Sequence, residues 1–183
     1  MLPAPSGARA VVVGGTAWHV VAADVHPQWI AEAVADDPIA APLGARFLAA
    51  LADRVGAEPG VLDAVLVAGP GTSPLELGAA DLDHPRVERA RLHRSDVRVL
   101  VTSDGAGVLT VGRGVAGRWE VGLEVEPAAR GRGLGTALAL AARAHVPDGS
   151  PVWAQVAPAN TASLRAFLAA GYRPVGAEVL FGP

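Results

Sequence analysis

The sequence contains no cysteine and no lysine. It has 183 residues, and all 15 of its Lys and Arg residues are arginine. Without cysteine the chain cannot form a disulfide framework, a thiol nucleophile or a cysteine-ligated zinc site. Without lysine it has neither a P-loop lysine nor an amine that could form a Schiff base. These two absences exclude kinase-like and pyridoxal-type enzymes.

Long apolar runs are also absent. The sequence has no stretch of about 18 consecutive apolar residues, so it predicts no membrane-spanning helix. Its first nine residues include two prolines and no basic cluster ahead of a long apolar stretch, which is not typical of a signal peptide. We therefore expect a cytoplasmic protein without a membrane partner.

The composition is that of a globular protein, with 51% hydrophobic residues, 18% charged residues and a net charge of −3. The length predicts one domain, and the charge predicts no general attraction to nucleic acid. Residues 1–85 carry 3 Arg against 10 acidic residues, whereas residues 86–183 carry 12 Arg against 8. The second part is the better place for an anionic ligand, unless the asymmetry is a chance distribution of surface residues.

The pattern of apolar, glycine and proline residues predicts alternating strands and helices, and hence an α/β fold. In the first part we predict strands at 10–13, 18–22 and 61–67, helices at 27–35 and 43–55, and a loop at 69–78. In the second part we predict strands at 97–102, 108–112, 119–126, 152–156, 172–175 and 178–181, and helices at 133–145 and 161–170.

The most informative segment is residues 125–136, where a strand leads through a glycine-rich turn into a helix. Amide groups at the start of a helix are unpaired, and the helix dipole makes this end partly positive. Gly131, Gly133 and Gly135 leave room for a phosphate, and Arg130 and Arg132 add charge. The segment therefore predicts a diphosphate cradle, because these features favour bound phosphates.

The glycine spacing distinguishes this segment from a dinucleotide-binding turn. It reads Gly-x-Gly-x-Gly over residues 131–135, whereas the dinucleotide fingerprint is Gly-x-Gly-x-x-Gly followed by an acid about 20 residues later. The alternative is a glycine-rich connection that binds no ligand, since glycine motifs alone are weak signals.

Two motifs resemble those of the GNAT superfamily of acyl-CoA-dependent N-acetyltransferases. The first is Arg130-x-x-Gly133-x-Gly135, preceded by a strand that ends in Val125-Glu126-Pro127. The second begins with Asn160 and Ser163 at a helix start and continues to Gly171 and Tyr172. The resemblance covers about residues 97–181.

The resemblance implies a mixed, mostly antiparallel twisted sheet with helices on both faces and a splayed pair of parallel central strands. Residues 86–183 would form the acyl-CoA-binding core. Residues 1–85 would be a variable region of the same domain that shapes the acceptor site.

The implied cofactor is acetyl-CoA. Its pyrophosphate would meet the amides of the glycine-rich turn, and its pantetheine arm would run along the strand edge at residues 123–125. Amide groups exposed between splayed strands can also polarise a thioester carbonyl. The cofactor-binding residues implied by the resemblance are Leu123, Glu124, Val125, Arg130, Gly131, Arg132, Gly133, Leu134, Gly135, Thr136, Asn160, Ser163 and Phe167.

The implied reaction is direct attack of an amine on the thioester, which requires a base for the amine proton. The candidate bases are Glu120 and Glu124, acting directly or through water. The alternative is that each belongs to a solvated strand face paired with nearby Arg113 or Arg118. Phe167 stands where the family often has a tyrosine acid, and Gln155 stands where some members have a glutamate. The sole tyrosine, Tyr172, is at a position that is normally structural.

Several outcomes follow from these departures: catalysis relayed by water, an acceptor that is already neutral, or loss of activity. The acceptor would be a small-molecule or peptide amine, and the family allows a homodimer. An acyl-CoA-binding regulatory or sensor module without turnover is the alternative function. The basic run at residues 86–98 is either a solvated helix or strand face, or a contact to the cofactor's ribose phosphate or an acidic acceptor.

Overall fold

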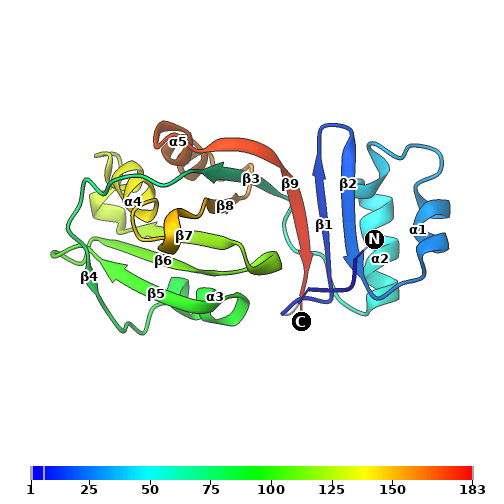
Figure 1. Ribbon diagram of the computed structural model, residues 1–183, viewed down its shortest axis with the longest axis horizontal. Helices are drawn as coiled ribbons and strands as arrows, with labels where there is room; N and C mark the ends of the chain where they lie inside the picture. Colours follow the sequence, from blue (N-terminus) through cyan, green and yellow to red (C-terminus); the bar gives the residue numbers. More distant parts are fainter. Residues whose placement is uncertain (1, 6, 183) are drawn as a thin grey trace. The chain divides into compact units, whose positions relative to one another are not determined.

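The computed structural model describes residues 2–5 and 7–182 and divides into two compact units (Figure 1). Unit 1 comprises residues 1–65 and 175–183, and unit 2 comprises residues 66–174. The chain passes between the units within β3 (Asp63–Ala68) and within β9 (Arg173–Phe181). The boundary expected at residues 85 and 86 falls inside unit 2, at the start of α3 (Pro85–His93).

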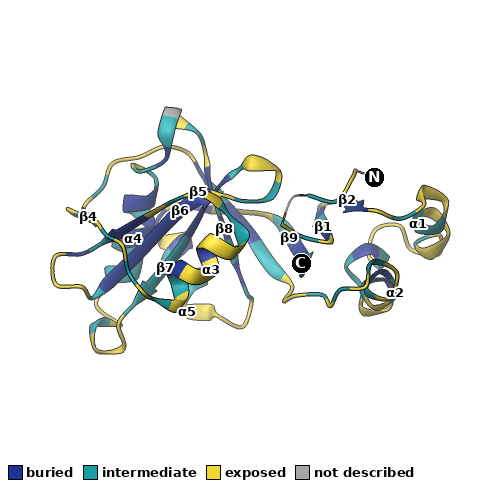
Figure 2. Cartoon of the chain, turned by 90° about the horizontal axis from the view of Figure 1, so that it is seen from below, coloured by how far each residue is buried: buried dark blue, intermediate teal, exposed yellow. Residues whose placement is uncertain are grey.

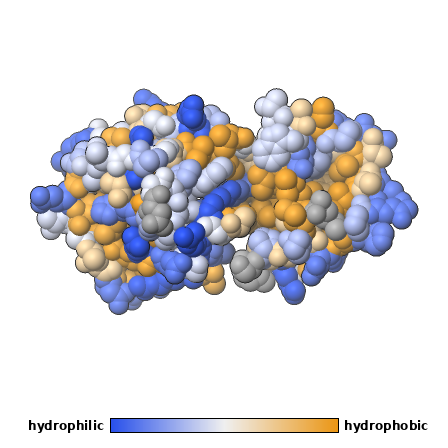
Figure 3. All heavy atoms as spheres, in the orientation of Figure 1, coloured by the Kyte–Doolittle hydropathy of each residue, from blue (hydrophilic) through white to orange (hydrophobic). Residues whose placement is uncertain are grey.

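Unit 1 is built on three antiparallel strands in the order β2 (Trp18–Ala23), β1 (Ala10–Gly15) and β9. The helices that follow β2 are α1 (Pro27–Ala33), η1 (Ala41–Leu43) and α2 (Ala45–Val55). Figure 3 shows hydrophobic residues gathered over the strands of this unit. Apolar residues of the strands and of α2 form its core, which includes Val12, Val21, Phe47, Leu51, Val179 and Phe181.

Unit 2 contains the strand order β8 (Val152–Val156), β7 (Trp119–Val125), β6 (Gly107–Arg113), β5 (Ser95–Val101) and β4 (Gly78–Ala79). The β7–β8 pair is parallel, whereas the other neighbours in this order pair antiparallel. Short 3₁₀ turns join the elements at η2 (Val115–Gly117), η3 (Pro127–Ala129) and η4 (Pro147–Gly149). The predicted α/β class with a mostly antiparallel sheet is confirmed.

Helices cover both faces of the sheet in unit 2. A Cβ added at Gly122 of β7 would lie 3.4 Å from Arg86, so α3 covers the face that carries Glu120 and Glu124. The opposite face of β6 and β7 is covered by α4 (Leu134–Ala142), whose Leu138 would lie 3.0 Å from a Cβ added at Gly107. Helix α5 (Thr161–Ala169) packs against α4 and β8. Figure 2 shows strands of this unit buried beneath helices whose outer faces are exposed.

Several elements differ from the sequence prediction, which gave neither β4 nor a separate helix α3. Helix α3 occupies much of the basic run. The sequence pattern does not predict it as a distinct helix, because only Val87 and Ala90 among its nine residues are buried. Helix α4 ends at Ala142 rather than at residue 145. Strand β9 is continuous, where two strands were predicted; Gly176 lets it pass beside β1, since a Cβ there would lie 2.3 Å from the carbonyl oxygen of Gly14.

Across the described ranges 2–5 and 7–182, every helix is too short or too polar to cross a membrane.

Candidate active site

The parallel strands β7 and β8 separate part of the way along unit 2. Their pairing covers Trp119–Val121 of β7 and Val152–Ala154 of β8, whereas β7 runs on to Val125 and β8 to Val156. On its other side β7 pairs with β6 along its whole length. The strands therefore form a fork that opens beyond Val121.

The register of β6 and β7 shows which backbone groups face this fork. The amide of Glu126 donates to the carbonyl of Ala106 at 2.9 Å, so residues 120, 122, 124 and 126 direct their backbone groups toward β6. The intervening residues Leu123 and Val125 direct theirs toward the fork, where the carbonyl of Val125 already accepts a hydrogen bond from Nε of Arg130. This edge can bind an extended chain that contains amide groups, as a neighbouring strand would.

The glycine-rich turn lies between β7 and α4. Gly131 has φ of 75°, and Gly133, the N-cap of α4, has φ of 84°. Only glycine adopts this left-handed conformation without strain. A Cβ added at either glycine would have no heavy atom within 4 Å, so both face open space. No side chain caps α4, so a ligand can approach the amides of its first turn.

Gly135 has a different role, because it faces the interior. A Cβ added there would lie 3.6 Å from Cβ of Ala166 in α5 and 3.9 Å from Cγ2 of Val125 in β7. These are ordinary van der Waals distances, so an alanine would fit here, and the position is enclosed by α5 and β7 rather than open to a phosphate. Thr136 and Leu134, the other residues of this first turn, are half-buried.

Two arginine side chains accompany the turn. Nε of Arg130 donates to the carbonyl of Val125 at 2.9 Å, and Nη2 of Arg132 donates to the carbonyl of Ala128. Both residues are exposed. Uncapped helix amides and two cationic side chains form a donor set that suits a diphosphate, so the predicted cradle fits the chemistry of coenzyme A.

The second motif lies at the start of α5. Asn160 is its N-cap, and Oδ1 of Asn160 accepts the amide of Ser163 at 3.1 Å. Asn160 is exposed and Ser163 is half-buried. Phe167 lies in the interior, 4% exposed, with its ring edge-to-face against Tyr172 at 4.9 Å between centroids.

The hydroxyl of Tyr172 donates to the carbonyl of Ala139 in α4 at 3.1 Å. Burial raises the pKa of Tyr172 above its usual range, because the phenolate would be desolvated. The sole tyrosine of the chain therefore has a structural position and cannot donate a proton to a ligand at the fork.

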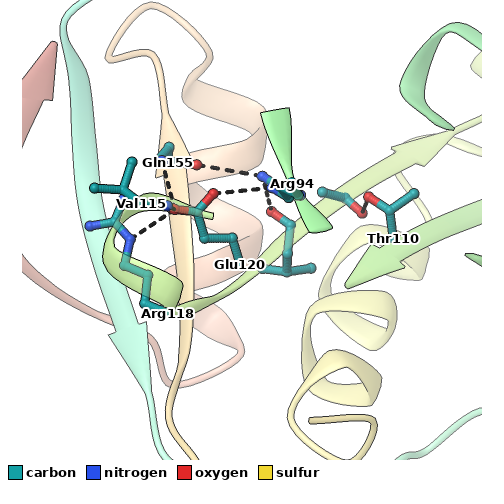
Figure 4. Close-up of polar contacts among 8 residues, drawn as sticks. Arg94, Thr110, Val115, Arg118, Glu120 and Gln155 are labelled. Atoms are coloured by element: carbon teal, nitrogen blue, oxygen red, sulfur yellow. Dashed lines mark hydrogen bonds and ion pairs between the residues drawn. The ribbon is translucent and has the colours of Figure 1, made fainter. Parts of the chain in front are cut away.

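Glu120 lies at the centre of a buried polar cluster on the α3 side of β7 (Figure 4). It is 3% exposed, and its carboxylate accepts hydrogen bonds from four donors. These are Nε of Arg118 at 2.8 Å, Nε of Arg94 at 3.1 Å, the amide of Val115 at 3.1 Å and Nε2 of Gln155 at 3.2 Å. Burial lowers the pKa of Arg94, an effect opposed by Glu120, and a guanidinium stays charged in such a pair.

Glu124 lies two residues further along the same face and is more accessible. Its side chain is 40% exposed, and Oε2 lies 3.5 Å from Nε of Arg86 in α3. An ion pair this exposed contributes little to stability, so the carboxylate is available to a solvent molecule or a ligand. Sequence reasoning missed the pairing of Arg86 and Arg94 with these glutamates. The basic run at residues 86–98 was the only signal for it.

No group of three or more His, Asp or Glu side chains that could hold a metal occurs in residues 2–5 and 7–182.

The sequence profile of the Acetyltransferase (GNAT) family matches residues 81–172, which is half of the chain. The chain belongs to the GNAT acetyltransferase family. The match contains the fork, the glycine-rich turn and the start of α5. No curated protein matches the chain.

Two solved structures resemble the chain. One is an acetyltransferase of the GNAT family from Colwellia psychrerythraea, with a TM-score of 0.52, 9% identity, and coverage of 91% of this chain and 76% of that one. At this identity the likeness shows the fold alone. The other is a GCN5-related N-acetyltransferase from Kribbella flavida, with a TM-score of 0.46, 18% identity and coverage of 74% of this chain. This chain spans 63% of the length of the Kribbella protein.

Proposed function

We propose that this protein transfers an acetyl group from acetyl-CoA to a primary amine of a small-molecule or peptide acceptor. The observation that carries the proposal is the fork between β7 and β8, which opens beyond Val121. The uncapped N-terminus of α4 follows β7 directly through the glycine-rich turn. A cytoplasmic location and a homodimer stay predictions from the sequence.

The residues that would hold acetyl-CoA come from three segments. The amides and arginines of residues 130–136 would bind the diphosphate, and the exposed edge of β7 at Leu123 and Val125 would bind the amide-containing arm. Asn160 and Ser163 would contact the arm or a phosphate from the start of α5. When bound, acetyl-CoA supplies an activated acyl thioester. Phe167 would support the site by packing, because it is buried.

We assign Glu124 as the base, directly or through one water. The attacking amine must lose a proton as the amide bond forms, and a carboxylate that is 40% exposed can accept it. Glu120 is less suited to this role, since two arginines, an amide and Gln155 already occupy its oxygens. Tyr172 and Phe167 supply no acid, so the thiolate leaves unassisted by a phenol.

The test is a turnover assay with acetyl-CoA and a panel of amines, combined with calorimetric measurement of CoA binding. Free CoA can be followed with a thiol reagent without background, because the protein has no cysteine. Loss of thioester with release of CoA supports the enzyme. Tight binding without turnover supports an acyl-CoA sensor instead. Absence of thermal stabilisation by saturating CoA refutes both functions.

A further inference from the structure

We propose that Glu120, Arg94 and Gln155 form a clamp that fixes the position at which β7 and β8 separate. Through this clamp they act as positioning residues for the exposed edge of β7. The inference rests on the proposed function, because that edge is where acetyl-CoA would bind. We call these three residues the fork clamp.

The first link of the fork clamp joins the two strands directly. Glu120 belongs to the paired part of β7, opposite Trp153, whereas Gln155 is the first residue of β8 beyond the last backbone pair, Val121 with Ala154. Nε2 of Gln155 donates to Oε1 of Glu120 at 3.2 Å. A side-chain hydrogen bond therefore connects the strands where their backbone pairing ends.

The second link is the guanidinium of Arg94, which contacts both strands at once (Figure 4). Its Nε donates to Oε2 of Glu120 at 3.1 Å, and its Nη2 lies 3.4 Å from Oε1 of Gln155. The same Nη2 lies 3.5 Å from the carbonyl oxygen of Val121, the last paired residue of β7. One planar group thus holds the end of the paired segment.

Burial makes the fork clamp rigid. The side chains of Glu120 and Arg94 are 4% and 13% exposed, so water competes little for their hydrogen bonds. Arg118 and the amide of Val115 also donate to Oε1 of Glu120, which prevents the carboxylate from turning away. A charged group buried with this many partners has one favourable arrangement.

Removal of the link between Gln155 and Glu120 would act on the end of β8, because β6 holds β7 along its full length, whereas β8 is held on its other side by β3. Without the amide of Gln155, the side-chain link from β8 to Glu120 is lost, and the end of β8 can shift either to pair further along β7 or to move away from it. Pairing further would cover the backbone groups of Leu123 and Val125. Moving away would widen the fork. Either change displaces a binding edge, and a displacement of ~1 Å can lower catalysis by ~100-fold.

The experiment compares Gln155→Met with the control Thr110→Val. Methionine keeps the length of glutamine and removes its hydrogen bonds. Thr110 is fully buried, and its Oγ1 donates to the carbonyl of Gly122 at 3.2 Å, on the β6 side of β7. Thr110→Val therefore removes a side-chain hydrogen bond between β6 and β7. Gln155→Met removes the hydrogen bonds to Glu120 and from Arg94, and the first of these joins β7 to β8.

Gln155→Met is expected to raise Kd for acetyl-CoA by about tenfold and to lower kcat as well. Thr110→Val is expected to lower Tm about as much as Gln155→Met does, while its Kd and kcat stay within about twofold of those of the unmodified protein. Hydrogen exchange provides a readout that needs no ligand. In Gln155→Met, the amides of Leu123 and Val125 should gain protection if β8 pairs further, and the amide of Val121, the last paired residue of β7, should lose protection if the fork widens; all three should be unchanged in Thr110→Val.

Unchanged exchange at all three amides in Gln155→Met would overturn the fork clamp, as would equal Kd and kcat in the two variants. If the unmodified protein still turns over acetyl-CoA, that result supports the proposed function even though the fork clamp is wrong. If instead the unmodified protein does not bind acetyl-CoA, the proposed function fails and the positioning role fails with it. In that case the hydrogen-exchange comparison still tests, without any ligand, whether the three residues hold the position at which β7 and β8 separate.

Discussion

Substitution of Gly133 by alanine has two effects that can be measured separately, one on the affinity for acetyl-CoA and one on the stability of the fold. Gly133 has φ of 84°, so alanine adds backbone strain of about 1–2 kcal/mol. For a protein of this size we expect Tm to fall by roughly 2–8 °C. The added Cβ meets no protein atom within 4 Å, so no clash adds to this cost.

The same Cβ would stand in the open space where the diphosphate is proposed to bind. Loss of one charge-assisted hydrogen bond costs about 1.5–3 kcal/mol. We therefore expect Kd for acetyl-CoA to rise by about 10- to 100-fold. Isothermal titration calorimetry measures this change, and differential scanning fluorimetry measures Tm on the same samples.

Gly149→Ala is the matched control. Gly149 has φ of 63°, also faces open space, and lies in η4, beyond the C-terminus of α4. It should lower Tm to a similar extent and leave Kd unchanged. The proposed cradle is refuted if Gly133→Ala binds acetyl-CoA like the unmodified protein, or if Gly149→Ala loses as much affinity.

Three further variants test single residues. Glu124→Gln should lower kcat by roughly 100-fold and remove the acidic limb of its pH profile, with Kd for acetyl-CoA nearly unchanged; an unaltered profile removes Glu124 from the reaction. Tyr172→Phe should cost about 1 kcal/mol, since it removes the bond to Ala139, and should leave turnover intact. Because the folded state raises the pKa of Tyr172 above 10.0, urea unfolding should show stability that falls as pH rises past 10.0 in the unmodified protein but not in this variant. Burial, Arg89 and Arg94 lower the pKa of His93 below 6.5. The free energy of unfolding should therefore fall as pH drops from 6.5 through the lowered pKa, because the unfolded state binds the proton first. In His93→Gln, urea unfolding should show a smaller loss of stability over this pH range.

Much of unit 2 is predictable from the sequence because its turns carry local signals. The strands predicted at residues 97–102 and 108–112 are joined by a tight turn in which Gly105 has φ of 70°. Asp104 accepts the hydroxyl of Thr102 at 2.7 Å and the amide of Ala106 at 3.1 Å. The glycine-rich turn and the N-cap at Asn160 are likewise encoded within a few residues. Local chemistry of this kind needs no knowledge of distant partners.

The remaining features depend on contacts between distant residues. The alternation of β7 places Glu120 on the face of the strand that looks polar, and it is buried because Arg94, 26 residues earlier, reaches it from the end of α3. Nothing near Glu120 in the sequence indicates this partner. The close passage of Gly176 beside Gly14 is equally invisible, because the two residues come from opposite ends of the chain.

Strand β9 sets the order in which unit 1 can be completed during synthesis. Phe181 lies opposite Ala10 and Val179 opposite Val12, so synthesis must proceed as far as these residues before β1 gains its second neighbour. Until then one edge of β1, with its three consecutive valines, has no strand to cover it. Such an edge invites pairing with other nascent chains. A chain truncated ahead of Val179 would leave this edge of β1 uncovered permanently.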